Sequence, residues 1–236
     1  MMPDIPPLET LVETSRKLHD VIVRIVLDCS KELPKERFTT SLMAISMIWS
    51  RICRTHLAAI VLVENHLPGE AVILETTEFE LFLDLLYLGQ DLDNRAKEWL
   101  EHSRTEATPW NVGHKIATVF PTNQSTAKGT YELLCSIKRG NPAAGSLGFY
   151  IPHDQKDLHP KAMDCFAVGC STYIMLQSTL ALMDSLECAP SPSDTEALGI
   201  WKDYLVGLIH QAVDAQEFYA AFNRQPISEA LFPDPL

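Results

Sequence analysis

The sequence lacks most of the short motifs by which catalytic and metal-binding sites are identified. It contains no glycine-rich phosphate loop, no Gly-x-Ser-x-Gly turn and no His-Glu-x-x-His helix. None of its 8 histidines has a glutamate three residues before it, so the Glu-x-x-His pairs with which helical bundles hold two metal ions are missing. Its 6 cysteines form neither a Cys-x-x-Cys pair nor a zinc-like group with histidine. We therefore expect no metal and no cofactor, and we expect reduced thiols that are mostly buried.

Positive charge is also scarce. The 19 lysines and arginines are outnumbered by 31 aspartates and glutamates, which leaves a formal net charge of −12. Non-specific binding to nucleic acid or to a membrane surface needs a positive field, so this balance argues against both partners. The first residues show no basic segment followed by an apolar run, and no apolar run reaches the about 18 residues of a membrane span. We expect a cytoplasmic protein without a signal peptide.

Apolar residues at helical spacing are what the sequence has in plenty. They make up 46% of the chain against 21% charged residues, an ordinary balance for a globular protein. No strand-like alternation of useful length accompanies them. The pattern predicts an all-α bundle of seven or eight mostly antiparallel helices. We expect a single domain over residues 1–225 and a C-terminal tail over residues 226–236.

Prolines, glycines and capping residues set the predicted helix bounds. The sixth helix is expected to be capped by Ser125 or Thr126. The last helix is expected to be capped by Ser193 or Asp194. The stretch 140–160 is rich in glycine and proline and is expected to be a loop. The predicted helices cover about 7–33, 36–66, 68–89, 94–106, a short segment within 108–120, 125–139, 161–187 and 194–222.

The helix expected over Pro68–Gly89 organises the chain, because it is too apolar for a surface helix and yet is interrupted by the carboxylates of Glu75, Glu78, Glu80 and Asp84. Glu80 and Asp84 are four residues apart and share one face of it. Glu75 and Glu78 are three residues apart and share another face. We expect these carboxylates to be paired with Arg or Lys, or to be exposed at a helix edge. A buried acidic site is the alternative.

The segment from Arg51 to His56 has the Arg-x4-His spacing of HEPN-type ribonucleases, which it resembles in these two residues. In that family the arginine and the histidine act on the RNA phosphodiester without a metal, generally across a dimer face. Two positions five apart on a straight helix differ by about 140°, so the side chains do not converge unaided. Ile52 stands where that family usually has a polar residue. His56 also lies on the apolar stripe of its helix, where a hydrogen-bonded core histidine is the commoner finding.

Residues 73–88 resemble the signature helix of a bacterial all-helical family of unknown function, and through it, distantly, HEPN domains. In that helix an arginine precedes a glutamate by four residues, and a Tyr-Leu pair follows about two turns later. Glu80 matches the glutamate and Tyr87-Leu88 matches the pair, but Thr76 stands in place of the arginine. The resemblance therefore implies a helical bundle with no established activity, in which the usual Arg–Glu pair is missing.

Residues 131–142 resemble a later helix of the same family that ends in a polar turn. Ser136, or Cys135, and the Gly-Asn-Pro sequence around Asn141 match, whereas Arg139 stands where a histidine is common. The resemblance spans roughly residues 35–190. We hypothesise that Arg139 or Lys138 packs near the central helix and supplies the positive charge that its arginine would have provided.

Two functions of different classes follow from these observations. The first is a non-enzymatic interaction or ligand-binding module, with Glu80, Asp84, Tyr87, Arg139 and Asn141 as candidate ligand-binding residues and the 140–160 loop beside them. The second is a HEPN-like, metal-independent ribonuclease of a defence or toxin–antitoxin system, with Arg51 and His56 as catalytic residues. The apolar stripes on 161–187 and 194–222 lead us to expect a homodimer. The identity of any other protein partner or small ligand is left open.

Overall fold

The computed structural model describes residues 6–34, 39–102, 110–139 and 158–222 of the chain. These residues form eight α-helices and no β-strand, which confirms the predicted all-α bundle. The helices, in chain order, are α1 (Leu8–Glu32), α2 (Thr40–Glu64), α3 (Pro68–Gly89), α4 (Leu92–His102), α5 (Val112–Val119), α6 (Gln124–Lys138), α8 (Leu158–Ser185) and α9 (Pro192–Phe222).

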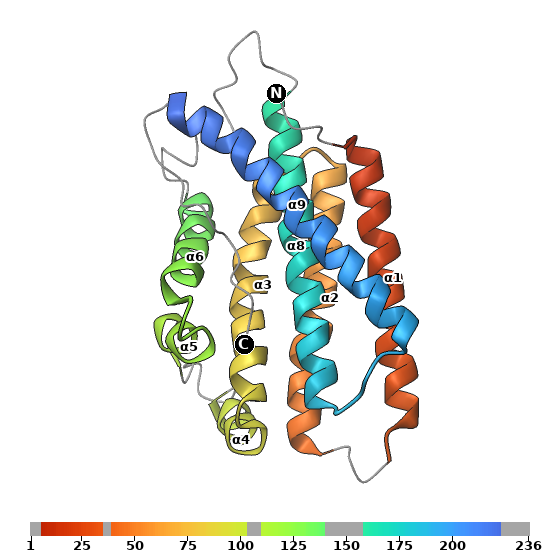
Figure 1. The fold of residues 1–236 in the computed structure, drawn as a ribbon. Helices are drawn as coiled ribbons and strands as arrows, with labels where there is room; N and C mark the ends of the chain where they lie inside the picture. Colours follow the sequence, from red (N-terminus) through yellow and green to blue (C-terminus); the bar gives the residue numbers. More distant parts are fainter. Residues whose placement is uncertain (1–5, 35–38, 103–109, 140–157, 223–236) are drawn as a thin grey trace.

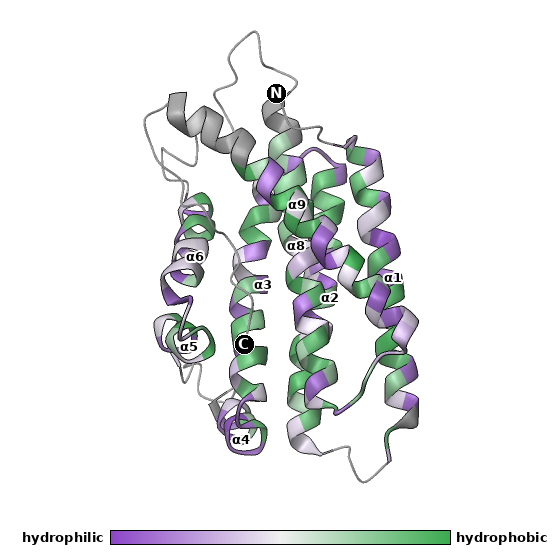
Figure 2. Cartoon of the chain, in the orientation of Figure 1, coloured by the Kyte–Doolittle hydropathy of each residue, from purple (hydrophilic) through white to green (hydrophobic). Residues whose placement is uncertain are grey.

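Helix α8 lies in the middle of the bundle, where α1, α2, α3 and α9 all pack against it (Figure 1). Every residue from Ala162 to Thr179 is buried. A helix that is enclosed on all sides needs no polar face, and this explains why the sequence of α8 is apolar around its whole circumference. Figure 2 shows that α2 and α3 are also mostly hydrophobic, whereas the peripheral α4 is mostly hydrophilic.

Helix α9 crosses α8 obliquely and covers its outer side (Figure 1). The two helices approach closely at Gly169, where an added Cβ would lie 3.0 Å from Ile209 Cγ1. The apolar stripes on 161–187 and 194–222, on which the expected homodimer was based, therefore pack against each other within one chain. Leu198, Leu205, Leu208 and Ala212 of the second stripe are buried, and its positions from 214 onward lie outside the described side chains.

Helices α4, α5 and α6 lie on the side of α3 that faces away from α8 (Figure 1). Helices α5 and α6 pack against α3 and against each other, and α4 packs against α2 and α3. Helix α3 is therefore covered on two opposite sides by different sets of helices. The carboxylates of Glu75, Glu78, Glu80 and Asp84 meet different neighbours for this reason.

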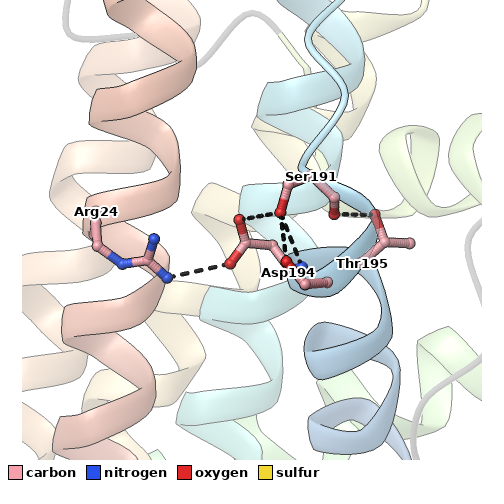
Figure 3. Close-up of polar contacts among 5 residues, drawn as sticks. Arg24, Ser191, Asp194 and Thr195 are labelled. Atoms are coloured by element: carbon pink, nitrogen blue, oxygen red, sulfur yellow. Dashed lines mark hydrogen bonds and ion pairs between the residues drawn. The ribbon is translucent and has the colours of Figure 1, made fainter.

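The start of α9 differs from the predicted cap. The cap is Ser191, neither Ser193 nor Asp194: its Oγ accepts the backbone N–H of Asp194 at 3.1 Å, and Pro192 is the first helical residue (Figure 3). Arg24 of α1 donates to Asp194 Oδ1 at 3.2 Å and so connects α1 to this turn. The hydrogen bonds from Ser191 and Arg24 lower the pKa of the Asp194 carboxyl.

Other predicted bounds also needed correction. Helix α2 begins at Thr40 instead of residue 36. Thr39 is its N-cap, because the Thr39 side chain accepts the backbone N–H of Leu42. Helix α6 begins at Gln124, before the two predicted caps. Helix α8 begins at Leu158, so the end of the predicted 140–160 loop is helical, with Pro160 in the first turn where it breaks no hydrogen bond. Residues 140–157 lie outside the described part of the chain.

Two helices are long and apolar enough to cross a membrane by length and composition alone. They are α2 and the Ala162–Ser185 portion of α8. The most apolar window of α8 is 89% buried among the other helices, which is the environment of a core helix. The corresponding window of α2 is only 39% buried, so much of its apolar surface faces outward.

Candidate functional site

The two residues of the Arg-x4-His motif lie in different environments. His56 is fully buried between α1, α2 and α8, whereas Arg51 is exposed on the outer side of α2. The ring of His56 stacks on that of His19, with 5.9 Å between the ring centroids. Burial, with a smaller contribution from His19, lowers the pKa of His56 to about 3. The buried imidazole is therefore neutral, and it shares no surface with Arg51.

His56 belongs to a chain of hydrogen bonds through the core. Its Nε2 lies 3.2 Å from Ser15 Oγ, and its Nδ1 lies 2.8 Å from Ser171 Oγ. Ser15 Oγ continues to Thr172 Oγ1 at 2.7 Å. Ser171 Oγ continues to Glu78 Oε1 at 3.0 Å. Sequence reasoning missed the three hydroxyls, because serine and threonine within an apolar helix carry no signal of which neighbours they will meet.

The donor and the acceptor of each hydrogen bond in this series can be assigned by counting hydrogens, beginning at Thr172. The Thr172 hydroxyl donates its only hydrogen to the carbonyl of Val168 at 2.5 Å, and a carbonyl can only accept. Thr172 Oγ1 must then accept from Ser15. Because Ser15 has used its hydrogen, its oxygen accepts from His56 Nε2–H. The neutral imidazole consequently has a bare Nδ1.

The same count sets the protonation of Glu78. The bare Nδ1 of His56 accepts the hydrogen of Ser171, and the oxygen of Ser171 then needs a donor. Ser171 Oγ lies 3.0 Å from Glu78 Oε1. If the hydrogen of Ser171 is directed at Nδ1, this contact is a hydrogen bond only when Glu78 carries a proton. This agrees with the effect of burial, which raises the pKa of the Glu78 carboxyl well above its ordinary value.

Glu75 is the second buried carboxyl of α3. It is fully buried, and neither of its oxygens has a hydrogen-bond partner among the described residues. Burial, and then the neighbouring Glu78, raise its pKa well above the ordinary value. No ion pair joins Glu75 or Glu78 to a lysine or arginine in the described ranges. The expectation that the carboxylates of α3 are paired or exposed is therefore wrong for these two, because α2 and α8 cover that face of α3 and place no cation there.

The other polar residues predicted on α3 face α5 and α6. Glu80, Asp84 and Tyr87 each make one polar contact across this boundary, and the contacts attach α5 and α6 to the bundle. They are Glu80 Oε1 with the Tyr131 hydroxyl (2.9 Å), Asp84 Oδ1 with Lys115 Nζ (2.6 Å), and the Tyr87 hydroxyl with His114 Nε2 (3.1 Å).

The Asp84–Lys115 pair is well shielded from water. The side chain of Asp84 is 17% exposed and that of Lys115 is 4% exposed. Burial raises the pKa of Asp84, although the charge and hydrogen bond of Lys115 act in the opposite direction. Tyr87 is held from both sides, since the Arg95 guanidinium lies 3.7 Å from its ring centroid and the Trp110 ring lies at 4.7 Å.

In the structure Glu80 contacts a different residue of α6 from the hypothesised Lys138 or Arg139. Helix α6 does pack against α3, but the residue that reaches Glu80 is Tyr131, two turns earlier on α6. Arg139 follows the last residue of α6 and is exposed. Asn141, the remaining candidate ligand-binding residue, lies outside the described residues.

A cavity of about 540 Å³ opens between α5 and α6. Tyr131 forms part of its wall, so the cavity lies directly beside the Glu80 contact. Its lining combines aliphatic residues of α5 with polar and charged residues of α6. The lining residues are Val112, Gly113, Ile116, Gln124, Lys128, Tyr131, Glu132, Cys135, Ser136 and Arg139.

Cys135 is the cysteine that lines this cavity. It is partly exposed, whereas Cys53, Cys165 and Cys170 are buried. Burial raises the pKa of Cys53 and of Cys165 to about 12, so these thiols stay protonated and inert.

Comparison of the chain with protein-family models, with curated proteins and with solved structures finds no match.

Proposed function

We propose that the chain is a non-enzymatic ligand-binding module whose site is the cavity between α5 and α6. The observation that carries this proposal is the size and lining of the cavity. Its volume of about 540 Å³ is that of a typical small-molecule site, and Val112 and Ile116 supply apolar walls. Lys128 and Arg139 supply positive charge at the same cavity. A small organic anion with an apolar or aromatic part suits this combination.

The position of the charges supports an anionic ligand. Lys128 is 3.7 Å from Glu132 one turn later, in a pair with both side chains about two-thirds exposed. No carboxylate pairs with Arg139 in the described part of the chain. Arg139 therefore offers its planar, bidentate guanidinium to a carboxylate or phosphate group. The three contacts of Glu80, Asp84 and Tyr87 serve the site by holding α5 and α6 against α3.

The ribonuclease alternative needs Arg51 and His56 to reach one phosphodiester group. In this structure His56 is fully buried in a hydrogen-bonded chain and Arg51 points outward. No observation brings the two side chains to a common surface. We therefore do not propose this activity.

Cys135 allows a direct test of the cavity. The probe is dithiobis(nitrobenzoate), an aromatic dicarboxylate disulfide: the Cys135 thiolate attacks one of its sulfurs, forms a mixed disulfide and releases coloured thionitrobenzoate. We expect a fast phase that disappears in Cys135→Ser and whose rate saturates with reagent concentration, because the reagent binds before it reacts. Peptide mass analysis identifies the labelled cysteine.

The contribution of positive charge at the cavity is tested by comparing a substitution of Arg139 with a control substitution of Lys17 on α1. Arg139→Gln should slow the reaction at low reagent concentration about fivefold, the size of a partly exposed charge contact. Lys17→Gln removes one positive charge from the exposed surface of α1 and should leave the rate unchanged. A rate that is linear in reagent and indifferent to Arg139→Gln would reject the proposed site.

A further inference from the structure

Helix α2 carries apolar residues on two opposite faces. The inner face packs in the core, and its buried residues include Ile45, Ile52 and Ala59. The outer face presents large apolar side chains to solvent. They are Met43, Met47, Leu57 and Val61, with exposed fractions of 58%, 54%, 37% and 48%. Four such side chains on one face of one helix form an interaction surface, unlike scattered single exposures.

The spacing of this outer face is that of a helix–helix contact. Positions 43, 47, 50, 54, 57 and 61 alternate steps of four and three residues, as the seam of a coiled coil does. We call these six positions the outer seam of α2. Within the described ranges, α2 packs against α1, α3, α4 and α8, and every seam position except the half-buried Ser50 remains exposed. The seam has the pattern of a contact whose second helix is not part of the bundle.

One half of the outer seam lies in a groove. A cavity of about 390 Å³ is lined by Met43 and Met47 of α2, by Leu81 of α3 and by Trp99 of α4. Arg51 and Arg54 line the same cavity. Methionines adapt their shape to an incoming apolar side chain, so this groove suits an inserted leucine or aromatic residue.

The charge of the outer face is opposite to that of the chain. The chain has a net charge of −12, yet α2 carries Arg51 and Arg54 and no acidic residue before Glu64. In the part of the chain that the structure describes, no carboxylate forms an ion pair with either arginine. The Arg54 side chain donates from its Nε to the carbonyl of Ser50, at 3.4 Å.

We propose that the outer seam of α2 binds an amphipathic helix of a partner protein, and that this helix places glutamates or aspartates opposite Arg51 and Arg54. Leucine-like residues of the partner fill the groove at Met43 and Met47 and extend toward Leu57 and Val61. The carboxylates at the centre satisfy the two guanidiniums and set the register.

Charge argues against two other occupants of the outer seam. A second copy of this chain, placed on the seam about a two-fold axis, would bring four guanidiniums together with no carboxylate between them. An anionic membrane would meet two arginines on a protein with a net charge of −12, which is too little positive field for surface attachment. An amphipathic helix with acidic residues complements both the residue spacing of the outer seam and the positive charge of Arg51 and Arg54.

The test uses two synthetic peptides of about 20 residues, long enough to span the seam at 1.5 Å per residue. Both carry leucines at alternating steps of three and four and a fluorescein label. One has glutamates flanking the centre of the leucine stripe, and the other has lysines at the same positions. In fluorescence anisotropy at low salt, the protein should bind the glutamate peptide at least about tenfold more tightly than the lysine peptide.

Charge reversal separates this contact from general stickiness. Arg51→Glu/Arg54→Glu should invert the preference, so that the lysine peptide now binds more tightly. Met47→Glu should weaken both peptides. The matched control is Lys17→Glu/Lys31→Glu, the same charge change at exposed positions of α1, which should keep the original preference. Circular dichroism verifies that each variant is folded.

Three outcomes would overturn the proposal. The first is equal binding of the two peptides, or a preference that survives the arginine reversal. The second is a concentration-dependent dimer in sedimentation equilibrium that Met47→Glu abolishes, which assigns the seam to a second copy. The third is binding to vesicles of phosphatidylcholine and phosphatidylserine that is lost on reversal of the arginines, which assigns it to a membrane.

Discussion

Helix α3 carries two pairs of carboxylates on opposite faces, and the fold treats the two pairs in opposite ways. Glu75 and Glu78 are fully buried and pair with no cation among the described residues, and their pKa values are raised by burial. Glu80 and Asp84 lie toward α5 and α6, where Tyr131 and Lys115 contact them. A half-turn of one helix separates a neutral pair from a partnered pair.

The difference teaches that a carboxyl group buried without a cationic partner binds a proton, whereas a carboxyl group buried beside a cation forms an ion pair. Transferring a bare carboxylate into the core would cost far more than binding a proton, so Glu78 becomes a hydrogen-bond donor to Ser171. Asp84 lies 2.6 Å from the Lys115 ammonium, whose positive charge compensates a carboxylate that is only 17% exposed. Three predictions test this contrast.

The largest effect is expected from Asp84→Ala. The substitution leaves the Lys115 ammonium buried and without its partner, which should lower the free energy of unfolding by about 3 kcal/mol in urea titrations. The double variant Asp84→Ala/Lys115→Met should recover most of this loss. Glu98→Ala, at an exposed position of α4, serves as the control and should have little effect. A loss as small as that of the control would place Asp84 in the same class as a surface carboxylate.

Glu75→Met should act in the opposite direction. Neither oxygen of Glu75 is hydrogen-bonded to a described residue, so an apolar side chain of similar length removes buried polar atoms without breaking a contact seen in the structure. We expect a gain of about 1–2 kcal/mol in the same titration. Glu80→Met is the matched substitution on the other face, and it should be destabilising because it removes the partner of Tyr131. Destabilisation by Glu75→Met would mean that its carboxyl has a partner, such as an internal water.

The pH dependence of stability tests the protonation of Glu78. An unfolded glutamate loses its proton near its ordinary pKa of 4.5, whereas the folded Glu78 retains it to higher pH. The folded state therefore binds more protons above pH 4.5, and this group makes stability fall as pH rises, by up to about 1.4 kcal/mol per pH unit. The decline stops once pH exceeds the folded pKa.

His56 contributes with the opposite sign. Its folded pKa is about 3 against 6.5 for the ordinary imidazole, so the unfolded state binds more protons between these values and stability rises with pH across that window. Glu78 and His56 oppose each other from pH 4.5 to 6.5, whereas above pH 6.5 the decline due to Glu78 remains, together with that of Glu75, whose pKa is also raised. Glu78→Gln donates to Ser171 as the protonated acid does and does not titrate. We expect wild type to lose stability relative to Glu78→Gln between pH 6.5 and 8; parallel curves would indicate an ionised Glu78.

Much of the fold could be predicted because its determinants are local. The bounds of α3 follow from Pro68 and Gly89, and both match the structure. The errors at other ends, such as Ser191 capping α9 in place of Ser193 or Asp194, arise because several neighbouring residues can cap equally well. Only the packed turn, with Arg24 reaching Asp194, selects among them.

The candidate sites could be predicted only in part. Glu80 and Asp84 were singled out by their spacing and Tyr87 by the resemblance of residues 73–88, and the three residues share the face that meets α5 and α6. The cavity between α5 and α6 and the outer seam of α2 were missed, since neither is a property of one segment. The seam is visible in the spacing from Met43 to Val61, but the inner stripe of α2 has the same pattern, and a sequence does not state which of two stripes the bundle uses.

By itself the sequence determined an all-α bundle, its helical segments, an acidic net charge and the absence of familiar catalytic motifs. These properties depend on residues within a turn or two of each other. The tertiary structure alone decided which carboxylates of α3 are neutral, which helix is central and which face of α2 remains open. Those properties depend on what a neighbouring helix places within hydrogen-bonding distance, because the charge of a buried group is set by its surroundings and not by its position in the chain.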